Sequence, residues 1–298
     1  MSRVAFARTE DRKKAVRASL QGLAAVNRVR GKEVLIKPNF NTADPAPGST
    51  HNHTLVALVE ELWAMGARTI SLGERSYEPT RNVMEQKGII PLMEQRDVRI
   101  IDFDQLDESD WVNFEPRNSH WTNGFRIARP ILETECLVST CCLKTHQFGG
   151  IFTISLKLHV GVVPTFRHGY EYMAQLHRSP HQRKMIAEIN EPFSPALIVL
   201  DAIDVFVDGG PTTGKRVKGN VFVAGTDRVA VDAVGVAILK VLGSNEDIMK
   251  RKIFEQEQIA RAVELGLGVS SPSEINVVSV DPESQEYCDP VVEMLNKG

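Results

Sequence analysis

The sequence predicts an α/β protein with a mostly parallel sheet flanked by helices. Three observations support this: short apolar runs that end in polar residues, amphipathic segments between them, and glycine or proline at many of the junctions. The two kinds of segment alternate along the 298 residues. Because a crossover helix returns the chain to the same end of a sheet, strands joined in this way run parallel.

The first predicted unit is a strand, a helix and a strand. Residues 33–40 form an apolar run that ends at Pro38 and therefore resemble a buried strand. Residues 50–67 have helical periodicity, with a polar cap at the start and Gly66 near the end, and residues 68–74 form the next strand. The later segments repeat this pattern, with helices expected at 80–97, 180–193, 227–243 and 255–266, and strands at 98–104, 136–143, 196–210, 219–226 and 275–280.

Residues 110–130 interrupt the alternation. They favour a β-hairpin excursion with Asn123-Gly124 as its turn, because this dipeptide adopts the tight turns that join antiparallel strands. We expect a single domain over residues 1–298. Two lobes, residues 1–115 and 125–298, are the alternative.

The composition is that of a globular protein: 42% hydrophobic, 24% charged, with a net charge of −3. This balance gives no broad electrostatic case for binding nucleic acid or an anionic membrane. No run reaches the length of a membrane-spanning helix, and the first residues turn charged before a secretory signal could form. Four cysteines are too few for a disulfide scaffold, so a cytoplasmic location is predicted.

One glycine-rich motif partly matches a phosphate-binding loop. Gly209 to Arg216, GGPTTGKR, fits the glycine and lysine spacing of a phosphate-binding loop, but Arg216 occupies the position where Ser or Thr would hold magnesium. The segment that follows is a predicted strand, so no helix N-terminus would face the phosphate. A tight turn is the simpler interpretation, although its backbone amides could still bind an anion.

Polar residues follow the predicted strands, where ligands bind in sheets of this kind. Their bias towards Lys, Arg and His favours an anionic ligand such as a carboxylate or a phosphate. The candidate catalytic residues are His146, Lys144 and Lys157. The candidate ligand-binding residues are Lys37, Asn39, Thr145, Arg167, Gly210 and Gly214, with His168 beside them.

A divalent metal is a candidate cofactor. His51 and His53 form a His-x-His pair that could reach one metal, and the further candidate ligands are Glu74, Asp201 and Asp208. A polar turn that caps the following helix explains the two histidines at least as well.

The cysteines lack the clustered spacing of an iron–sulfur site, so no such cluster is expected in this chain. Cys141 and Cys142 are adjacent and face opposite sides of an extended strand. Buried, inert thiols are one interpretation. The other is a reactive Cys142, paired with His146 and with its thiol pKa lowered by the nearby Lys144.

These landmarks resemble a known family. LIKPNFN, GARTISLGE, CLKTHQFGGIFTISLKLHVGVVP, IVLDAIDVFVDGGPTTG and VFVAGTDRVAVDAVG occur in an order similar to the domain-of-unknown-function family numbered 362. The family pattern falls on Lys37, Pro38, Asn39, Gly73, Glu74, Lys144, Thr145, His146, Ser155, Lys157, Asp201, Gly210, Pro211, Gly214, Asp227 and Asp232. Many members carry a ferredoxin-like cysteine segment, which this chain lacks. The resemblance implies an association with iron–sulfur proteins and a ferredoxin-type redox partner, and supplies no established reaction.

The first functional hypothesis is an enzyme that holds a small anion with lysines at the strand ends and uses His146 as general acid or base. The alternative is a non-catalytic module that binds a metal or a redox partner, in which His51, His53 and Cys142 would matter more than the lysines.

Overall fold

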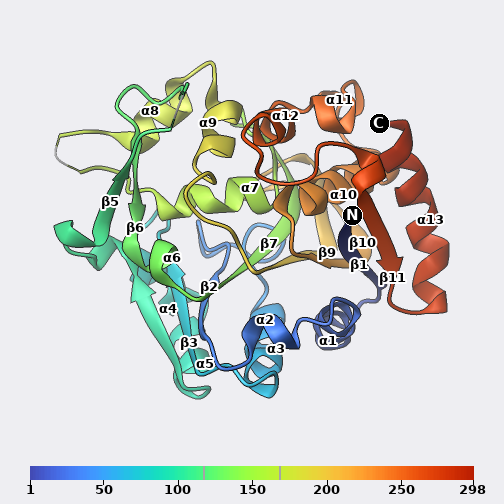
Figure 1. Cartoon of the computed structure of the whole chain (residues 1–298), viewed down its shortest axis with the longest axis horizontal. Coiled ribbons are helices and arrows are strands. Elements are labelled where there is room, and N and C mark those ends of the chain that lie inside the picture. The colour runs from blue at the N-terminus through green and yellow to red at the C-terminus, as the bar shows by residue number, and fades with distance from the viewer. Residues whose placement is uncertain (117, 168) are drawn as a thin grey trace.

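The computed structural model describes residues 1–116, 118–167 and 169–298. Within this part, nine strands form one main sheet, surrounded by helices (Figure 1). Eight of them follow one another across the sheet: β11 (Ile275–Ser279), β1 (Ser2–Arg8), β10 (Gly214–Gly225), β9 (Leu197–Gly209), β7 (Cys136–His146), β2 (Glu33–Lys37), β3 (Thr69–Glu74) and β4 (Val98–Asp102). The ninth, β8 (Ile151–Thr153), pairs with the end of β7.

The sheet is mostly parallel, as the sequence predicts. β4, β3, β2, β7 and β9 run in the same direction. β10 is antiparallel to both of its neighbours, β9 and β1, while β11 is parallel to β1. β8 is antiparallel to β7. The central parallel strands are buried on both faces, and their sequences accordingly contain runs of consecutive apolar residues rather than a strict alternation.

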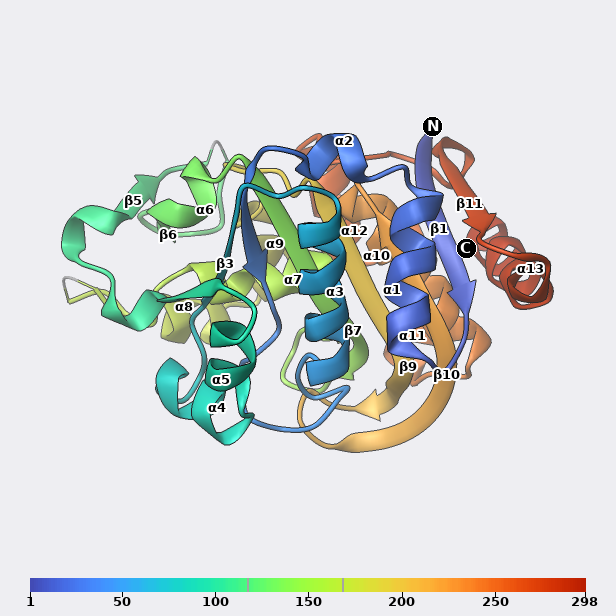
Figure 2. The ribbon, with the colours of Figure 1, turned by 90° about the horizontal axis from the view of Figure 1, so that it is seen from below.

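Helices cover both faces of the sheet (Figure 2). One core lies beneath α1 (Arg12–Gly22), α3 (Asn52–Ala64), α4 (Thr80–Gln86) and α5 (Ile89–Glu94). The opposite core lies beneath α7 (Ser155–Leu158), α10 (Arg228–Val241), α12 (Glu257–Glu264) and α13 (Pro282–Lys297). The remaining helices are α2 (Val26–Val29), α6 (Arg129–Glu133), α8 (Tyr172–Arg178), α9 (Gln182–Glu188) and α11 (Glu246–Met249).

The predicted hairpin excursion is present, but its turn is different. β5 (Trp111–Phe114) pairs antiparallel with β6 (Phe125–Ala128), and Phe114 faces Phe125 across the pair. The connection therefore spans residues 115–124, so the prediction of Asn123-Gly124 as a two-residue turn is wrong. The longer loop returns Trp121 to the core, where its ring is buried near Phe125 and its Nε1 donates to the Met185 carbonyl at 3.2 Å.

Strands from both of the expected lobes lie in the same sheet. β2 and β3, from residues 1–115, pair with each other, and β2 pairs with β7 from the second segment. The N-terminal strand β1, which the sequence analysis does not predict, lies between β10 and β11. Helices α1 and α13 are also absent from the predicted elements. None of the helices in the described ranges is long and apolar enough to cross a membrane.

Candidate functional site

The carboxyl ends of β2 and β3 carry a buried ion pair. Lys37 Nζ donates to Glu74 Oε1 and to the Pro38 carbonyl, the latter at 2.8 Å. The other Glu74 oxygen accepts from the Phe40 amide at 2.8 Å. Burial lowers the pKa of Lys37 and raises that of Glu74, and the mutual attraction of the pair opposes both shifts. The predicted ligand-binding Lys37 is therefore already neutralised within the protein.

Lys144 of β7 and Lys157 of α7, unlike Lys37, have no carboxylate partner among the described residues. Lys144 is buried, and its ammonium donates to the Gly48 carbonyl. Lys157 is half-buried, and no described residue gives its ammonium a hydrogen bond or an ion pair. Burial lowers the pKa of Lys144 to about 8, and burial together with Lys144 and Arg75 lowers the pKa of Lys157 to about 7. The Lys157 nitrogen keeps some contact with solvent.

His146 lies against Lys157. A β-carbon on Gly150 would lie 2.6 Å from Lys157 Cε and 3.0 Å from His146 Nδ1, so glycine allows both side chains to meet this backbone closely. Nδ1 of His146 is buried without a hydrogen-bond partner. Burial, followed by the charges of Lys157 and Lys144, holds the pKa of His146 far below its ordinary value. The imidazole is thus neutral at neutral pH, and the assignment of His146 as general acid or base stays a prediction.

Arg75 adds a third cation, itself buried, to Lys144 and the half-buried Lys157. Its guanidinium donates to Ser76 O, Thr165 Oγ1 and Val160 O, each at 3.1 Å, rather than to a carboxylate. Burial lowers the pKa of Arg75. We call Arg75, Lys144 and Lys157 the cation cluster. None of the three forms an ion pair within the described ranges.

Helix α7, which carries Lys157, is anchored by Asp232 of α10. One carboxylate oxygen of Asp232 accepts from the Ser155 amide at 2.8 Å, and the other accepts from the Leu156 amide at 3.2 Å. These are amides of the first turn of α7, which have no partner within the helix. Burial raises the pKa of Asp232 to about 7, against the hydrogen bonds from Ser155 and Leu156. Asp232 therefore positions the lysine without contacting it.

The loop after β2 folds back onto the end of β7. The Asn39 amide donates to Thr50 Oγ1 at 2.9 Å, and Asn39 Nδ2 donates to the Gly48 carbonyl at 3.3 Å. That same carbonyl accepts from Lys144. The predicted ligand-binding residue Asn39 therefore shapes the loop that holds Lys144.

The glycine-rich segment is the turn of the β9–β10 hairpin. A strand follows it, as predicted, so it is not a phosphate-binding loop. The Gly210 amide donates to the Thr213 carbonyl at 2.7 Å within the turn, and a β-carbon on Gly210 would lie 2.0 Å from the Thr145 carbonyl oxygen. Thr145 itself donates to the Phe206 carbonyl at 3.3 Å. This turn thus packs against the end of β7 through Thr145, Gly210 and Gly214.

The candidate metal ligands do not assemble. His51 is the N-cap of α3, and its Nδ1 accepts from the His53 amide at 3.0 Å, which matches the helix-cap interpretation. Glu74 is paired with Lys37. Asp201 accepts from Arg12 at 2.8 Å, and the exposed Asp208 accepts from the Gly209 amide at 2.9 Å. In residues 1–116, 118–167 and 169–298, no three His, Cys, Asp or Glu side chains are grouped to hold a metal ion.

Cys142 shares a face of β7 with Lys144, as the alternation predicts. Burial nevertheless raises the pKa of its thiol to about 11, and the attraction of Lys144 only partly offsets this. All four cysteines are free and buried. The expectation of a lowered Cys142 pKa is therefore wrong, because desolvation of the thiolate outweighs one neighbouring ammonium.

Two other predicted positions lie elsewhere. Arg167 donates to the Leu106 carbonyl at 3.2 Å, and its guanidinium is 5.6 Å from the Trp111 ring centre, so it braces the β5–β6 excursion. His168 is outside the described residues. Sequence analysis missed Arg75 and Gly150. Arg75 directly follows Glu74 at the end of a predicted strand, and the same strand-end reasoning could have found it.

The fold and the site define an α/β protein in which three cations, Arg75 after β3, Lys144 in β7 and Lys157 in α7, have no ion-pair partner among the described residues. The chain belongs to the family described as "Domain of unknown function (DUF362)", whose model matches residues 34–237. It is similar to thylakoid-associated protein sll1697 of Synechocystis sp. (strain ATCC 27184 / PCC 6803 / Kazusa), with 24% identity over 253 residues, 83% of this chain and 75% of that protein. A comparison with the lactate racemase apoprotein of Thermoanaerobacterium thermosaccharolyticum gives a TM-score of 0.49 and 14% identity, covering 97% of this chain and 86% of the other.

Proposed function

We propose that this protein is an enzyme that binds a small anion, a carboxylate or a phosphate ester, at the cation cluster. The observation that carries the proposal is that Lys144 is buried and Lys157 half-buried, and that neither has a carboxylate partner among the described residues. A buried charge is costly unless it is paired, and an anionic ligand would supply the missing partner. The four free thiols fit a reducing compartment, so we place this activity in the cytoplasm.

Lys157 is the proposed proton carrier. An efficient general acid or base has a pKa close to the working pH, and the pKa of Lys157 is about 7. His146 has too low a pKa for this role, and we assign it to packing beside Lys157. Lys144, which is fixed on the Gly48 carbonyl, would hold the anion while Lys157 gives or takes the proton.

A first experiment requires no knowledge of the substrate. The protein is treated briefly at pH 7.5 with a limiting amount of an amine-acylating reagent, and the modified lysines are located by mass spectrometry. An accessible lysine of lowered pKa is unprotonated at this pH and reacts first, so Lys157 is expected to be acylated before the exposed Lys252. Acylation of Lys252 and other surface lysines ahead of Lys157 would contradict the assignment.

The second experiment measures anion binding by calorimetry at pH 8 with inorganic phosphate and with succinate. An anion stabilises the protonated lysines, so binding should take up protons, which is detected by comparing buffers of different ionisation enthalpy. Lys157→Met should reduce the proton uptake to the share that belongs to Lys144, whereas Lys252→Met on the surface should leave it unchanged. Binding of either anion that is identical in the wild type and in Lys157→Met would place the anion elsewhere.

A further inference from the structure

Most of the exposed aromatic side chains of this protein occur close to the cation cluster. Among the residues that the structure describes, the exposed aromatic side chains are Tyr77, Phe148, Phe166 and Tyr287. The two phenylalanines are 61% and 54% exposed, although phenylalanine is usually buried. A single exposed apolar residue needs no explanation, whereas several of them beside a polar site are typical of a binding surface.

Phe148 lies next to the imidazole that packs against Lys157. Its ring centre is 5.9 Å from that of His146, and the two rings are nearly perpendicular, at 80°. On the other side of this imidazole, a β-carbon on Gly150 would lie 3.0 Å from His146 Nδ1 and 2.6 Å from Lys157 Cε. The exposed phenyl ring is therefore one side chain away from Lys157.

Phe166 and Tyr77 are close to Arg75 along the chain. Arg75 Nη1 donates to Thr165 Oγ1 at 3.1 Å, and Phe166 is the next residue. Tyr77 follows Arg75 by two positions, and its side chain is 81% exposed. Exposed rings thus occur near two members of the cation cluster, which come from different segments of the chain.

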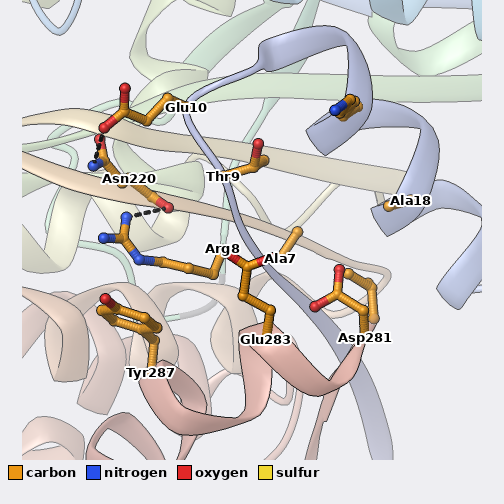
Figure 3. A pocket seen from close by; sticks show the side chains of 11 residues that line it. Ala7, Arg8, Thr9, Glu10, Ala18, Asn220, Asp281, Glu283 and Tyr287 are labelled. Atoms are coloured by element: carbon orange, nitrogen blue, oxygen red, sulfur yellow. Dashed lines mark hydrogen bonds between the residues drawn. The ribbon is translucent and has the colours of Figure 1, made fainter.

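Tyr287, the fourth exposed aromatic residue, lies in another part of the fold. It belongs to α13, and its ring centre is 4.0 Å from the guanidinium carbon of Arg8 in β1 (Figure 3). Two strands, β10 and β9, separate β1 from β7. Tyr287 already has a cation of the protein as its partner, so it provides a matched control for the other three rings.

We propose that the anion bound at the cation cluster carries an aromatic group, which packs against Phe148 and Phe166. This inference rests on the proposed function, because it describes a second part of the same ligand. The cations hold the charged end, and the exposed rings bury the other end. Aromatic rings attract one another in offset or edge-to-face contacts, beyond the effect of the area that they bury. The substrate class is therefore an aromatic carboxylate or an aromatic phosphate ester.

The test is calorimetry on the full chain at pH 8 with two matched pairs of anions. Phenyl phosphate is compared with methyl phosphate, and phenylacetate with acetate, so the members of each pair share one charged group. In at least one pair the phenyl compound should bind about tenfold more tightly, the effect of one aromatic contact with its buried area. Equal or weaker binding of both phenyl compounds would overturn this inference and leave the proposed function standing. No binding of any of the four anions would overturn the proposed function together with this inference.

Variants locate the aromatic contact. Phe148→Ala should remove most of the advantage of the phenyl compound and leave the affinity for its smaller partner unchanged, and Phe166→Ala should lower the same advantage. Both rings are more than half exposed, so neither change threatens folding. Tyr287→Ala should leave all affinities unchanged, and Lys157→Met should weaken both members of a pair by the same factor. A phenyl advantage that survives in the double variant Phe148→Ala, Phe166→Ala would refute the proposal.

Discussion

Replacing Lys157 with methionine should stabilise the free protein. Methionine fills a similar volume and carries no charge, whereas the Lys157 ammonium lies half-buried with no hydrogen-bond or ion-pair partner among the described residues. The variant therefore separates ligand binding from folding stability, which a substitution in a binding site usually lowers together. If the site is built for an absent anion, losing the lysine removes ligand binding and raises stability together.

The magnitude follows from the pKa. Burial, with help from Lys144 and Arg75, lowers the pKa of Lys157 from 10.5 to about 7. At about 1.4 kcal/mol for each tenfold change in protonation, this corresponds to roughly 5 kcal/mol of destabilisation at neutral pH. Partial exposure screens the charge, so we expect roughly 1–3 kcal/mol in practice. That is an increase in melting temperature of about 2–5 °C for a chain of this size.

The direction of this pKa shift determines how the stability difference between Lys157→Met and the wild type changes with pH. The folded pKa lies below the unfolded one, so the unfolded state binds the extra proton between pH 7 and 10.5. The destabilisation is complete below pH 7 and fades as the pH rises towards 10.5. The advantage of Lys157→Met over the wild type should accordingly be larger at pH 6.5 than at pH 9.5.

The assay is urea unfolding, followed by circular dichroism, of the wild type, Lys157→Met and the surface control Lys252→Met at both pH values. Lys252→Met should match the wild type at each pH. The prediction would be refuted if Lys157→Met were less stable than the wild type at pH 6.5 by about 1 kcal/mol or more. This threshold equals the smallest gain in stability that we expect. The ammonium would then be compensated by the protein, and no anion would be needed.

Three further predictions concern other parts of the site. Glu74→Gln leaves the buried Lys37 without its counter-charge and should cost about 3–5 kcal/mol of unfolding free energy. A second substitution in the same chain, Lys37→Met, should partly restore the stability. A loss below about 1 kcal/mol in Glu74→Gln would mean that the ion pair is not shielded from water. Gly150→Ala should displace Lys157, costing about 1–3 kcal/mol of stability and weakening the binding of phosphate in calorimetry; unchanged affinity would remove Lys157 from the site. The four buried thiols should resist a disulfide reagent at pH 8 in the native state and all react in urea, and rapid native labelling of Cys142 would show that its pKa is not raised.

The pattern of apolar runs and polar strand ends could be read from the sequence because both are local properties. Alternation places Cys142, Lys144 and His146 on one face of β7, and the parallel arrangement follows from the helices between strands. The same reasoning rejected the phosphate-binding loop, because the strand after it is visible in the sequence. The termini were missed: β1 buries a run of only four residues, Val4 to Ala7, and α13 contains Pro290.

The sequence by itself therefore determined the fold class and a set of basic residues at one edge of the sheet. Only the tertiary structure decided which of them are free. Lys37 and Lys157 look alike in the sequence, yet Lys37 meets Glu74 from a neighbouring strand, whereas Lys157 faces Lys144 and Arg75. A pKa depends on burial and on charges brought together by folding. The proposal of Lys157 rather than His146 as proton carrier therefore rests on contacts between residues far apart in the chain.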